Sequence, residues 1–405
     1  MIVDHDLPGL RHNVQMSPTA LPQRLLTPGP TQVPDQVLRA LALPLIHHRT
    51  GAFRTLFAEL RQRLAGVFRT RHPVLVITGS GTTAFEAAQG SLIDPGQTAI
   101  TCASGKFGER WQDIYDAFGV NQVRVDVDWG HAVRPEQVGA ALEAHKDARV
   151  VTLVHSETST ATVCDLKAIA AIVARTDALL IVDGITSVGA IPVEMDQWGV
   201  DVVVTGSQKA LMLPPGLGYV ALGERARHRL ARSSGCPQYH LDLRRWLAAA
   251  DQDNTPFTPP ISLIRGQHAA LGMIEGEGLE NVWARTARHA VATRAALEAM
   301  QLKPISAAPA DSLTGAYYPA TPAGPVDDAR FRSALQEKHG IHIAGGQTGR
   351  NGNFAGRIFR ISHMGHVSAD DTLAALEAIE TELGVAGVTV DRGAAVRAAK
   401  RVMVE

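Results

Sequence analysis

The stretch that decides the fold is Val200-Asp-Val-Val-Val-Thr-Gly-Ser-Gln-Lys209-Ala-Leu-Met-Leu-Pro-Pro-Gly-Leu-Gly218. The β-favouring run from Val202 to Thr205 predicts a short buried strand. A small polar turn then presents a single lysine, Lys209, before an apolar run that ends in prolines and glycine. Such a lysine loses its charge readily and becomes a nucleophile near neutral pH, although a surface lysine on a loop is the simpler interpretation of this stretch alone.

A second stretch lies upstream, Ala178-Leu-Leu-Ile-Val-Asp183-Gly-Ile-Thr-Ser-Val-Gly189, where a continuous apolar strand ends at Asp183. Such strands occur in parallel sheets buried on both faces, and ligands bind beyond their carboxyl ends. Because the next predicted strand delivers Lys209, we expect both residues at one edge of the sheet. An aspartate can hold the protonated ring nitrogen of pyridoxal phosphate, and a lysine its aldehyde as a Schiff base. Asp183 alone is more typical of a turn or cap, but the pair is much more specific.

Composition is that of an ordinary globular protein. The 405 residues suffice for roughly two or three domains, and 45% apolar and 20% charged residues predict a large core. A formal net charge of −1 and a pI of about 7.0 give no indication of binding to nucleic acid or to an anionic membrane. The N-terminus lacks the basic region and apolar segment of a signal peptide, and no apolar run is long enough to span a bilayer.

Cysteine and histidine predict neither a disulfide framework nor a metal site. Cys102, Cys164 and Cys236 form no CxxC motif, which fits buried small hydrophobes in a reducing cytoplasm. His47-His48 are adjacent and point apart, and His363-Met-Gly-His366 lies in a glycine-containing turn rather than on one helix face. We therefore predict a cytoplasmic protein without a metal.

Two loops in the first part of the chain suit a ligand. The rigid loop Leu26-Thr-Pro-Gly-Pro-Thr31 carries Gly29, whose backbone can approach a ligand carboxylate, although alone the loop is more typical of an ordinary turn. Gly79-Ser-Gly-Thr-Thr follows a strand and opens a helix, which provides free N–H groups and a helix dipole for a phosphate. This second loop is neither a Walker loop nor a full dinucleotide fingerprint.

The remaining pattern predicts two lobes. Strands and helices alternate over residues 73–222, as in a three-layer α/β domain with a mostly parallel sheet. A polar loop over residues 251–260 and helical patterns to about residue 300 lead to a small α/β lobe, in which we expect Arg357 or Arg360 to form a salt bridge. The basic tail after Gly387 is expected to be mobile. The predicted limits are 1–24 for an N-terminal arm with little structure, 25–285 for the large domain and 286–405 for the small C-terminal domain.

The whole pattern resembles the class V aminotransferases of the fold-type I pyridoxal-phosphate enzymes, most closely the alanine/serine–glyoxylate aminotransferase group. The resemblance runs from Leu26-Thr-Pro-Gly-Pro-Thr to Phe359-Arg-Ile-Ser-His-Met-Gly, nearly the whole chain. Its most specific motif is Thr205-Gly-Ser-Gln-Lys-Ala-Leu with Pro-Pro-Gly downstream, supported by Gly79-Ser-Gly-Thr-Thr, Glu157-Thr-Ser-Thr and Val182-Asp-Gly. It implies pyridoxal 5'-phosphate as cofactor and a homodimer with shared active sites.

The resemblance also implies roles for single residues. Lys209 is similar to the Schiff-base lysine that moves the proton of the substrate α-carbon, and Asp183 to the partner of the pyridinium nitrogen. Arg360 is similar to the arginine that binds the substrate α-carboxylate. The backbone at Gly29, predicted above to approach a carboxylate, is a second candidate for binding the substrate. The other positions implied to bind cofactor are Ser80, Gly81, Thr82 and Gln208 at the phosphate, Phe107, Thr158 and Ile185 around the ring, and Thr258 reaching the phosphate of the neighbouring subunit.

Two features depart from the glyoxylate group. The tyrosine often found just before the threonine at 258 is absent, with Thr255 and Phe257 nearby. His48-Arg49 stand where eukaryotic glyoxylate members carry small residues and where phosphoserine-type relatives bind the distal anion of the substrate. The pair therefore predicts either an acidic substrate or a structural role that braces the dimer, and we favour the second.

The leading hypothesis is a ping-pong transaminase that takes the amino group of alanine or serine and passes it to glyoxylate or pyruvate. Its alternative within the fold acts on phosphoserine, aspartate or glutamate. A cysteine desulfurase-like lyase is less favoured, because no cysteine follows Cys236. A non-catalytic relative would be expected to lack Lys209 or Asp183, and an NAD-binding oxidoreductase would need the full glycine fingerprint.

Overall fold

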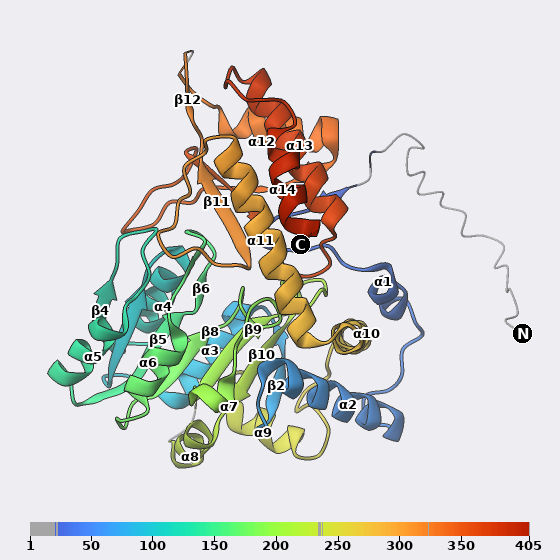
Figure 1. Cartoon of the computed structure of the whole chain (residues 1–405). Coiled ribbons are helices and arrows are strands. Elements are labelled where there is room, and N and C mark those ends of the chain that lie inside the picture. Colours follow the sequence, from blue (N-terminus) through green and yellow to red (C-terminus); the bar gives the residue numbers. More distant parts are fainter. Residues whose placement is uncertain (1–20, 22, 234–235, 237, 323, 405) are drawn as a thin grey trace, which may run out of the picture.

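The computed structural model describes residues 21, 23–233, 236, 238–322 and 324–404. A seven-stranded sheet in the order β2-β10-β9-β8-β5-β3-β4 forms the centre of the larger lobe (Figure 1). Neighbouring strands are parallel except for β10, which runs antiparallel to β2 and β9, so the predicted mostly parallel sheet is confirmed. The strands are β2 (Val74–Gly79), β3 (Thr98–Ala103), β4 (Asn121–Asp126), β5 (Ala148–Val154), β8 (Leu179–Asp183), β9 (Val202–Gly206) and β10 (Gly216–Leu222).

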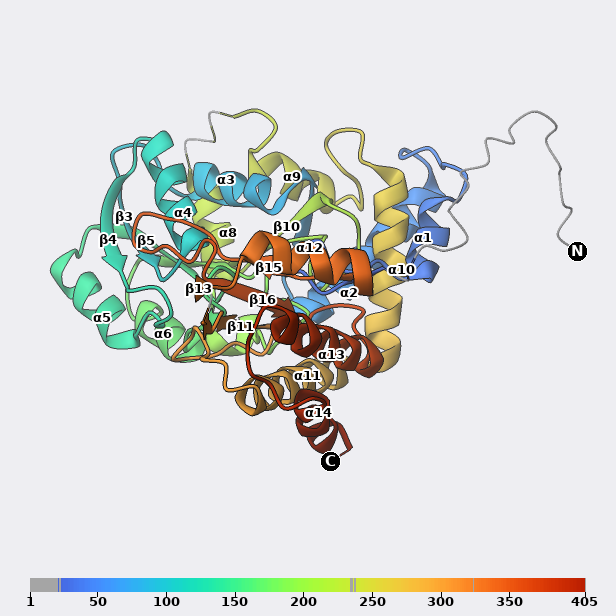
Figure 2. The same cartoon turned by 90° about the horizontal axis from the view of Figure 1, so that it is seen from above.

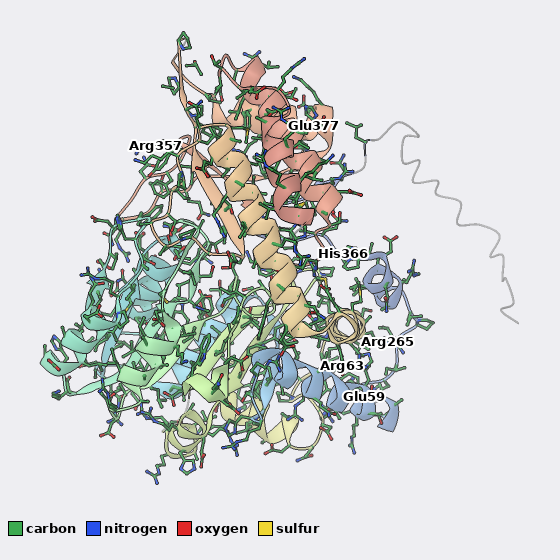
Figure 3. The ribbon with its side chains drawn as sticks, in the orientation of Figure 1. Glu59, Arg63, Arg265, Arg357, His366 and Glu377 are labelled. Carbon is green, nitrogen blue, oxygen red and sulfur yellow. The ribbon has the colours of Figure 1, made fainter. Side chains whose placement is uncertain are left out.

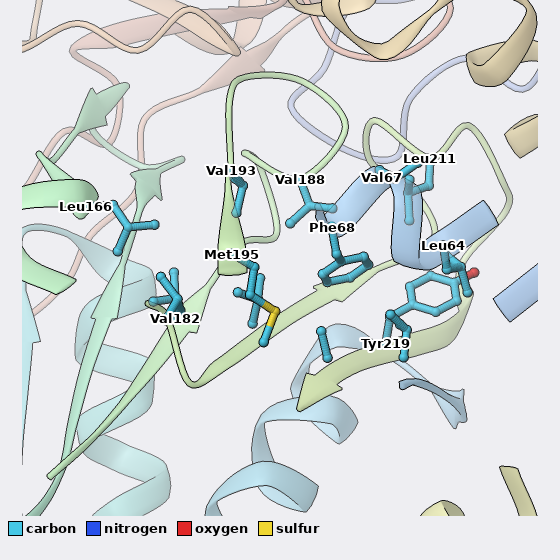
Figure 4. Packing of buried hydrophobic residues seen from close by; sticks show 14 of the residues in the cluster. Leu64, Val67, Phe68, Leu166, Val182, Val188, Val193, Met195, Leu211 and Tyr219 are labelled. Carbon is cyan, nitrogen blue, oxygen red and sulfur yellow. The ribbon is translucent and has the colours of Figure 1, made fainter. Parts of the chain in front are cut away.

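Helices cover both faces of this sheet and give the larger lobe three layers. One layer contains α1 (Asp35–Leu41), α2 (Gly51–Phe68), α5 (Pro135–Ala144), α6 (Leu166–Val173), α7 (Met195–Trp198) and α10 (Ile261–Glu277), and the other contains α3 (Gly81–Leu92), α4 (Lys106–Ala117), α8 (Glu224–Arg232) and α9 (Leu243–Ala250). Along β8, Leu180 and Val182 pack into the first layer, whereas Leu179 and Ile181 pack into the second. Figure 4 shows the first layer, where side chains of α2 lie beside Tyr219 of β10.

The C-terminal lobe lies over the carboxyl ends of the parallel strands (Figures 1 and 2). Its three-stranded antiparallel sheet has the order β11 (Leu313–Tyr317), β16 (Ile358–Ser362), β15 (Ala344–Gly345). Its helices are α11 (Leu279–Ala299), α12 (Asp328–His339), α13 (Ala369–Val385) and α14 (Ala394–Val404). The structure also has two short hairpins. β6 (Ser156–Glu157) pairs with β7 (Thr162–Val163) in the larger lobe, and β12 (Ala320–Thr321) pairs with β13 (Gly324–Pro325) in the C-terminal lobe.

The start of the described chain belongs to the C-terminal lobe. β1 (Arg24–Leu25) pairs in parallel with β14 (Ile341–His342), and Leu26 is buried in the core of that lobe. At the other predicted limit, α11 continues without a break past residues 285 and 286. Residues 1–20 and 22 of the predicted arm lie outside the described residues. The predicted domain limits therefore stay a prediction.

Side chains cap the starts of several described helices, and no described helix is long and apolar enough to cross a membrane. Asp165 accepts a hydrogen bond from the N–H of Ala168 at 3.0 Å and begins α6. Ser368 and Asp371 form a reciprocal capping box at the start of α13.

The tail after Gly387 is a packed helix, so the expected mobile segment is wrong. Ala395 and Ala399 of α14 are fully buried in the core of the C-terminal lobe, where α14 packs along α11. Glu380 of α13 accepts hydrogen bonds from the N–H groups of Gly393 at 2.5 Å and Ala395 at 2.9 Å. Small alanines one turn apart let α14 approach its neighbour closely, and its basic residues occupy the outer side.

Candidate active site

Lys209 and Asp183 lie at the same edge of the sheet, as predicted. β8 and β9 are parallel neighbours, and Lys209 follows the end of β9 by three residues. The Lys209 Nζ donates a hydrogen bond to the Pro28 carbonyl at 2.5 Å. Burial lowers the Lys209 pKa to about 8, and the nearby cations Arg360 and Arg110 act in the same direction while Asp183 opposes them. The amine is therefore partly neutral near physiological pH, as a nucleophile or proton acceptor must be.

Asp183 is the last residue of β8 and is 2% exposed. Its Oδ1 accepts a hydrogen bond from the N–H of Ile185 at 2.9 Å. Burial raises the Asp183 pKa to about 7, Glu157 adds to this shift, and the hydrogen bond from Ile185 opposes it. A positive charge beside the carboxylate would favour its ionised form, so this position suits a protonated ring nitrogen.

The loop that carries Gly29 lies directly on the Lys209 segment. Thr31 donates its N–H to the Gln208 carbonyl at 3.1 Å and its hydroxyl to the Lys209 carbonyl at 2.7 Å. Gly29 has a φ of +134°, and a Cβ on it would lie 2.2 Å from the Lys209 Nζ. Glycine is therefore required here to leave room for the lysine, a reason that the sequence did not show.

The predicted phosphate cradle is the N-terminus of α3. Ser80 is its N-cap, with the Ser80 Oγ accepting from the Thr83 N–H at 3.3 Å and the Ser80 N–H donating to the Thr83 Oγ1 at 3.0 Å. The N–H groups of Gly81 and Thr82 precede the first intrahelical hydrogen bonds and remain available to a ligand. Free donors at the positive end of a helix suit a phosphate.

Residues from the ends of β8 and β9 adjoin this cradle. A Cβ on Gly81 would lie 2.3 Å from the Ile185 Cδ1, and a Cβ on Gly206 would lie 3.4 Å from the Gly81 nitrogen and 3.0 Å from the Gln208 Oε1. That Gln208 oxygen is buried and has no hydrogen-bond partner among the described residues. An amide oxygen cannot donate to a phosphate, so Gln208 fits this ligand with its side-chain amide rotated by half a turn, which places the Nε2 donor beside the free helix N–H groups.

Glu157, for which no individual role was predicted, fixes the position of Phe107. Its fully buried carboxylate accepts hydrogen bonds from the N–H groups of Phe107 at 3.2 Å and Gly108 at 3.0 Å, and from the Ser159 hydroxyl at 2.6 Å. The Arg110 guanidinium lies over the Phe107 ring, 4.8 Å from its centroid. An acidic residue in a hydroxyl-rich turn just after a buried strand was the available signal for this anchor.

Arg360 in the middle of β16 is 5% exposed and bonds only to backbone carbonyls among the described residues. Its Nη1 donates to the Thr158 carbonyl at 2.7 Å, and its Nε and Nη2 donate to the Gly345 carbonyl at 3.1 and 2.7 Å. Burial lowers its pKa to about 10. The hydroxyl of Thr158 lies 3.2 Å from that of Thr186. Arg360 is thus a buried cation whose hydrogen-bond partners among the described residues are all neutral carbonyls, although the Glu157 carboxylate acts on it from beyond salt-bridge distance, and this state suits a carboxylate ligand.

The expected salt bridge of Arg357 or Arg360 is wrong. Arg357 lies at the exposed edge of the C-terminal lobe (Figure 3), where its Nη1 donates to the Asn353 carbonyl at 3.3 Å. Among the residues that the structure describes, neither guanidinium lies within salt-bridge distance of a carboxylate. The carbonyl oxygens of nearby loops satisfy Arg360 instead.

His48, Arg49 and Thr258 are not joined to the Lys209 group by the contacts of one chain. The Arg49 Nη1 donates to the Thr255 carbonyl at 3.2 Å, in the loop that carries Thr258, and Thr258 itself is exposed. The His47 and His48 rings lie 4.7 Å apart. In the described part of the chain, no group of three or more potential metal ligands gathers.

The fold and this site are those of a fold-type I pyridoxal-phosphate enzyme. Residues 24–371 match the family model Aminotransferase class-V, and the chain belongs to that family. The predicted family and its cofactor, pyridoxal 5'-phosphate, are confirmed. The available donors of α3 and Gln208, together with Asp183 and Lys209, fit this cofactor.

Similar proteins carry different names. The soluble hydrogenase 42 kDa subunit of Anabaena cylindrica is 40% identical over 384 residues, which cover 93% of this chain and 98% of that protein. The serine–glyoxylate aminotransferase of Methylorubrum extorquens is 32% identical over 401 residues, which cover 95% and 97%. The solved structure of aspartate aminotransferase from Thermus thermophilus superposes with a TM-score of 0.82 at 35% identity and covers 90% of this chain and 99% of its own.

Proposed function

We propose that this enzyme transfers the amino group of a small amino acid, alanine or serine, to glyoxylate or pyruvate in a ping-pong cycle. The proposal rests on one observation: Arg360, which lies near Lys209 and Asp183, has N–H groups without a hydrogen-bond partner among the described residues. Three of its five N–H groups bond carbonyls, which leaves one on each terminal nitrogen. Two N–H groups at the tip of a guanidinium suit bidentate binding of an α-carboxylate.

The residues divide the chemistry among them. Bound pyridoxal phosphate supplies an electron sink for the α-carbon of the amino acid. Asp183 would hold the positive charge of its ring nitrogen, and the N-terminus of α3 would hold its phosphate. Lys209 would take the proton of the substrate α-carbon on its Nζ and pass it to the carbon of the cofactor that carried the aldehyde oxygen, which its lowered pKa of about 8 permits near neutral pH.

We further propose a homodimer that completes each site. Leu38, Leu43 and Leu45 around α1 are large exposed apolar residues, and Leu45 is 70% exposed. Apolar side chains gathered on one exposed segment mark a contact surface, and His48-Arg49 follow directly. Thr258, exposed in its own chain, would reach the phosphate of the neighbouring subunit.

We also propose that the enzyme works in the cytoplasm. All three cysteines are free, and Cys102 and Cys164 are buried. Free buried thiols fit a reducing compartment.

The visible absorption of the purified enzyme, loaded with pyridoxal phosphate, tests the proposed activity. Adding L-alanine is expected to bleach the band of the bound cofactor, and adding glyoxylate is expected to restore it, since each half-reaction reverses the other. L-Aspartate and phosphoserine are added in parallel samples. A band that ignores alanine and responds only to these acids would replace the proposal with the acidic-substrate alternative, and a protein that forms no band would end both.

Arg49 separates the two alternatives more sharply. Because its guanidinium braces the Thr255 carbonyl, we expect Arg49→Ala to lower kcat/KM for alanine and for aspartate by the same factor. If Arg49 instead binds a distal carboxylate, only the acidic substrate should suffer, by roughly 100-fold or more for a lost ion pair. Steady-state kinetics with both donors measures the ratio. Arg54→Ala, on the exposed side of α2, is the matched control.

A further inference from the structure

The loop between β15 and β16 crosses from the C-terminal lobe to α4 of the larger lobe, where it meets Glu109. Glu109 is 1% exposed. Its Oε2 accepts a hydrogen bond from the Arg350 N–H at 2.7 Å, and its Oε1 accepts from the Asn351 N–H at 2.9 Å and from the Trp129 Nε1 at 3.2 Å. Three donors around one buried carboxylate form charge-assisted hydrogen bonds, which are stronger than neutral ones. Glu109 therefore fastens the loop to α4.

The loop also fits closely against α4 and Trp129. A Cβ on Gly349 would lie 2.3 Å from the Glu109 Oε2, and one on Gly352 would lie 2.3 Å from the Trp129 Cδ2. The side chain of Arg350 continues the contact on the exposed side, with its Nη2 donating to the Gln112 Oε1 at 2.7 Å and its Nη1 bonding to Asp113. This contact between the loop of residues 346–357 and α4 is called the clasp below.

The clasp closes a ring of contacts around the proposed substrate site. Glu109 follows Phe107 by two residues on α4, and Glu157 fixes the backbone of Phe107. Arg360 donates both to the Thr158 carbonyl, next to Glu157, and to the Gly345 carbonyl, at the base of the loop. The ring runs from α4 through the loop to Arg360, and then through residues 158 and 157 back to α4. The clasp and the Arg360 to Thr158 bond are its two links between the lobes.

We propose that Glu109 is a positioning residue for the arginine that binds the substrate carboxylate. By fastening the loop to α4, Glu109 fixes the Gly345 carbonyl and so orients the Arg360 guanidinium relative to Phe107. When a carboxylate binds, the Arg360 guanidinium keeps its orientation, because Glu109 holds the loop on α4 and the link between the lobes does not depend on Arg360 alone. This inference rests on the proposed function, since it takes Arg360 as the carboxylate-binding group.

Glu109→Gln tests the proposal in the cofactor-loaded enzyme. Glutamine keeps the size of the side chain but loses its charge. Its NH₂ group also faces an N–H donor that bonds a carboxylate oxygen in the wild type, so that hydrogen bond is lost. We expect the KM for L-alanine and for glyoxylate to rise about 10-fold, as for one charge-assisted hydrogen bond lost, with kcat changed less than about threefold. The amides of Arg350 and Asn351 are expected to exchange with solvent hydrogen faster than in the wild type. Glu377→Gln, exposed on α13 (Figure 3), is the matched control.

A double-mutant cycle with Arg360→Lys separates positioning from general loosening. If Glu109 acts through Arg360, Glu109→Gln adds little to the raised KM of the Arg360→Lys enzyme. Independent effects that multiply, or a wild-type KM in the folded Glu109→Gln enzyme, overturn the proposal. Should Glu109→Gln not fold, Arg350→Gln weakens the clasp from its exposed side and is subject to the same two criteria. A wild-type enzyme that fails to transaminate at all would remove the proposed function first, and this inference with it.

Discussion

Lys209→Ala is expected to abolish transamination and to lower kcat by roughly 10⁴-fold, the loss typical of a positioned acid–base group that also forms a covalent bond. Alanine offers neither a nucleophile nor a proton acceptor at this edge of the sheet. Lys209→Arg is expected to be as inactive, because a guanidinium stays protonated and cannot take up the α-proton. The pair of variants thus shows that a neutral amine is needed at this position, rather than a positive charge.

Initial rates with alanine and glyoxylate measure the effect, and Lys400→Ala on the exposed side of α14 is the control. Because burial disfavours the charged form of Lys209, its removal is not expected to lower the melting temperature. An inactive variant that melts like the wild type would therefore have lost chemistry rather than fold. A Lys209→Ala enzyme with more than about a tenth of the wild-type rate would contradict the assignment.

The central pair of residues could be predicted because it depends on local pattern and on one rule of topology. Asp183 and Lys209 each follow a continuous apolar strand, and neighbouring parallel strands end at the same edge of a sheet. The cradle at Ser80 is likewise a local signal, since a small polar turn between a strand and a helix leaves backbone donors free. For these residues, sequence neighbours decide the geometry.

The supporting residues could not be predicted, because their partners are distant in the sequence. Glu109 and Arg350 are 241 positions apart, and nothing near either residue indicates the other. Gly29 similarly needs its small size for Lys209, a residue of another loop. The prediction of a mobile tail after Gly387 was wrong for a related reason. The basic residues of the tail are evident in the sequence, whereas the alanine face of α14 can be recognised as a packing surface only beside α11. The sequence thus identifies the reacting groups more readily than the long-range contacts that orient them.

Asp183→Asn is expected to lower kcat by roughly 10²–10⁴-fold, since removing the partner of a buried charge costs about 3–5 kcal/mol and about 1.4 kcal/mol corresponds to one decade in rate. Asparagine has the same shape and can still accept the hydrogen bond from the N–H of Ile185, so the backbone is expected to keep its path. What it lacks is the negative charge that holds a proton on the ring nitrogen. The control is Asp126→Asn at the end of β4, an exposed aspartate that accepts from the Gln112 Nε2 at 2.7 Å, a bond that asparagine can also accept.

The pH dependence of this deficit identifies its cause. In the wild type, Asp183 supplies the charge that keeps the ring nitrogen protonated, whereas in the Asp183→Asn enzyme that proton must come from the solvent. The deficit relative to wild type is therefore expected to shrink as the pH falls. Protonation of Lys209, with its pKa of about 8, slows the wild type toward low pH. Because Asp183 raises that pKa, the Lys209 pKa is expected to be lower in the Asp183→Asn enzyme, and this loss of charge also makes the deficit shrink as the pH falls. A ratio of kcat values that stays constant with pH would mean that Asp183 acts by shape and hydrogen bonding alone, and its raised pKa of about 7 would then reflect burial without a catalytic purpose.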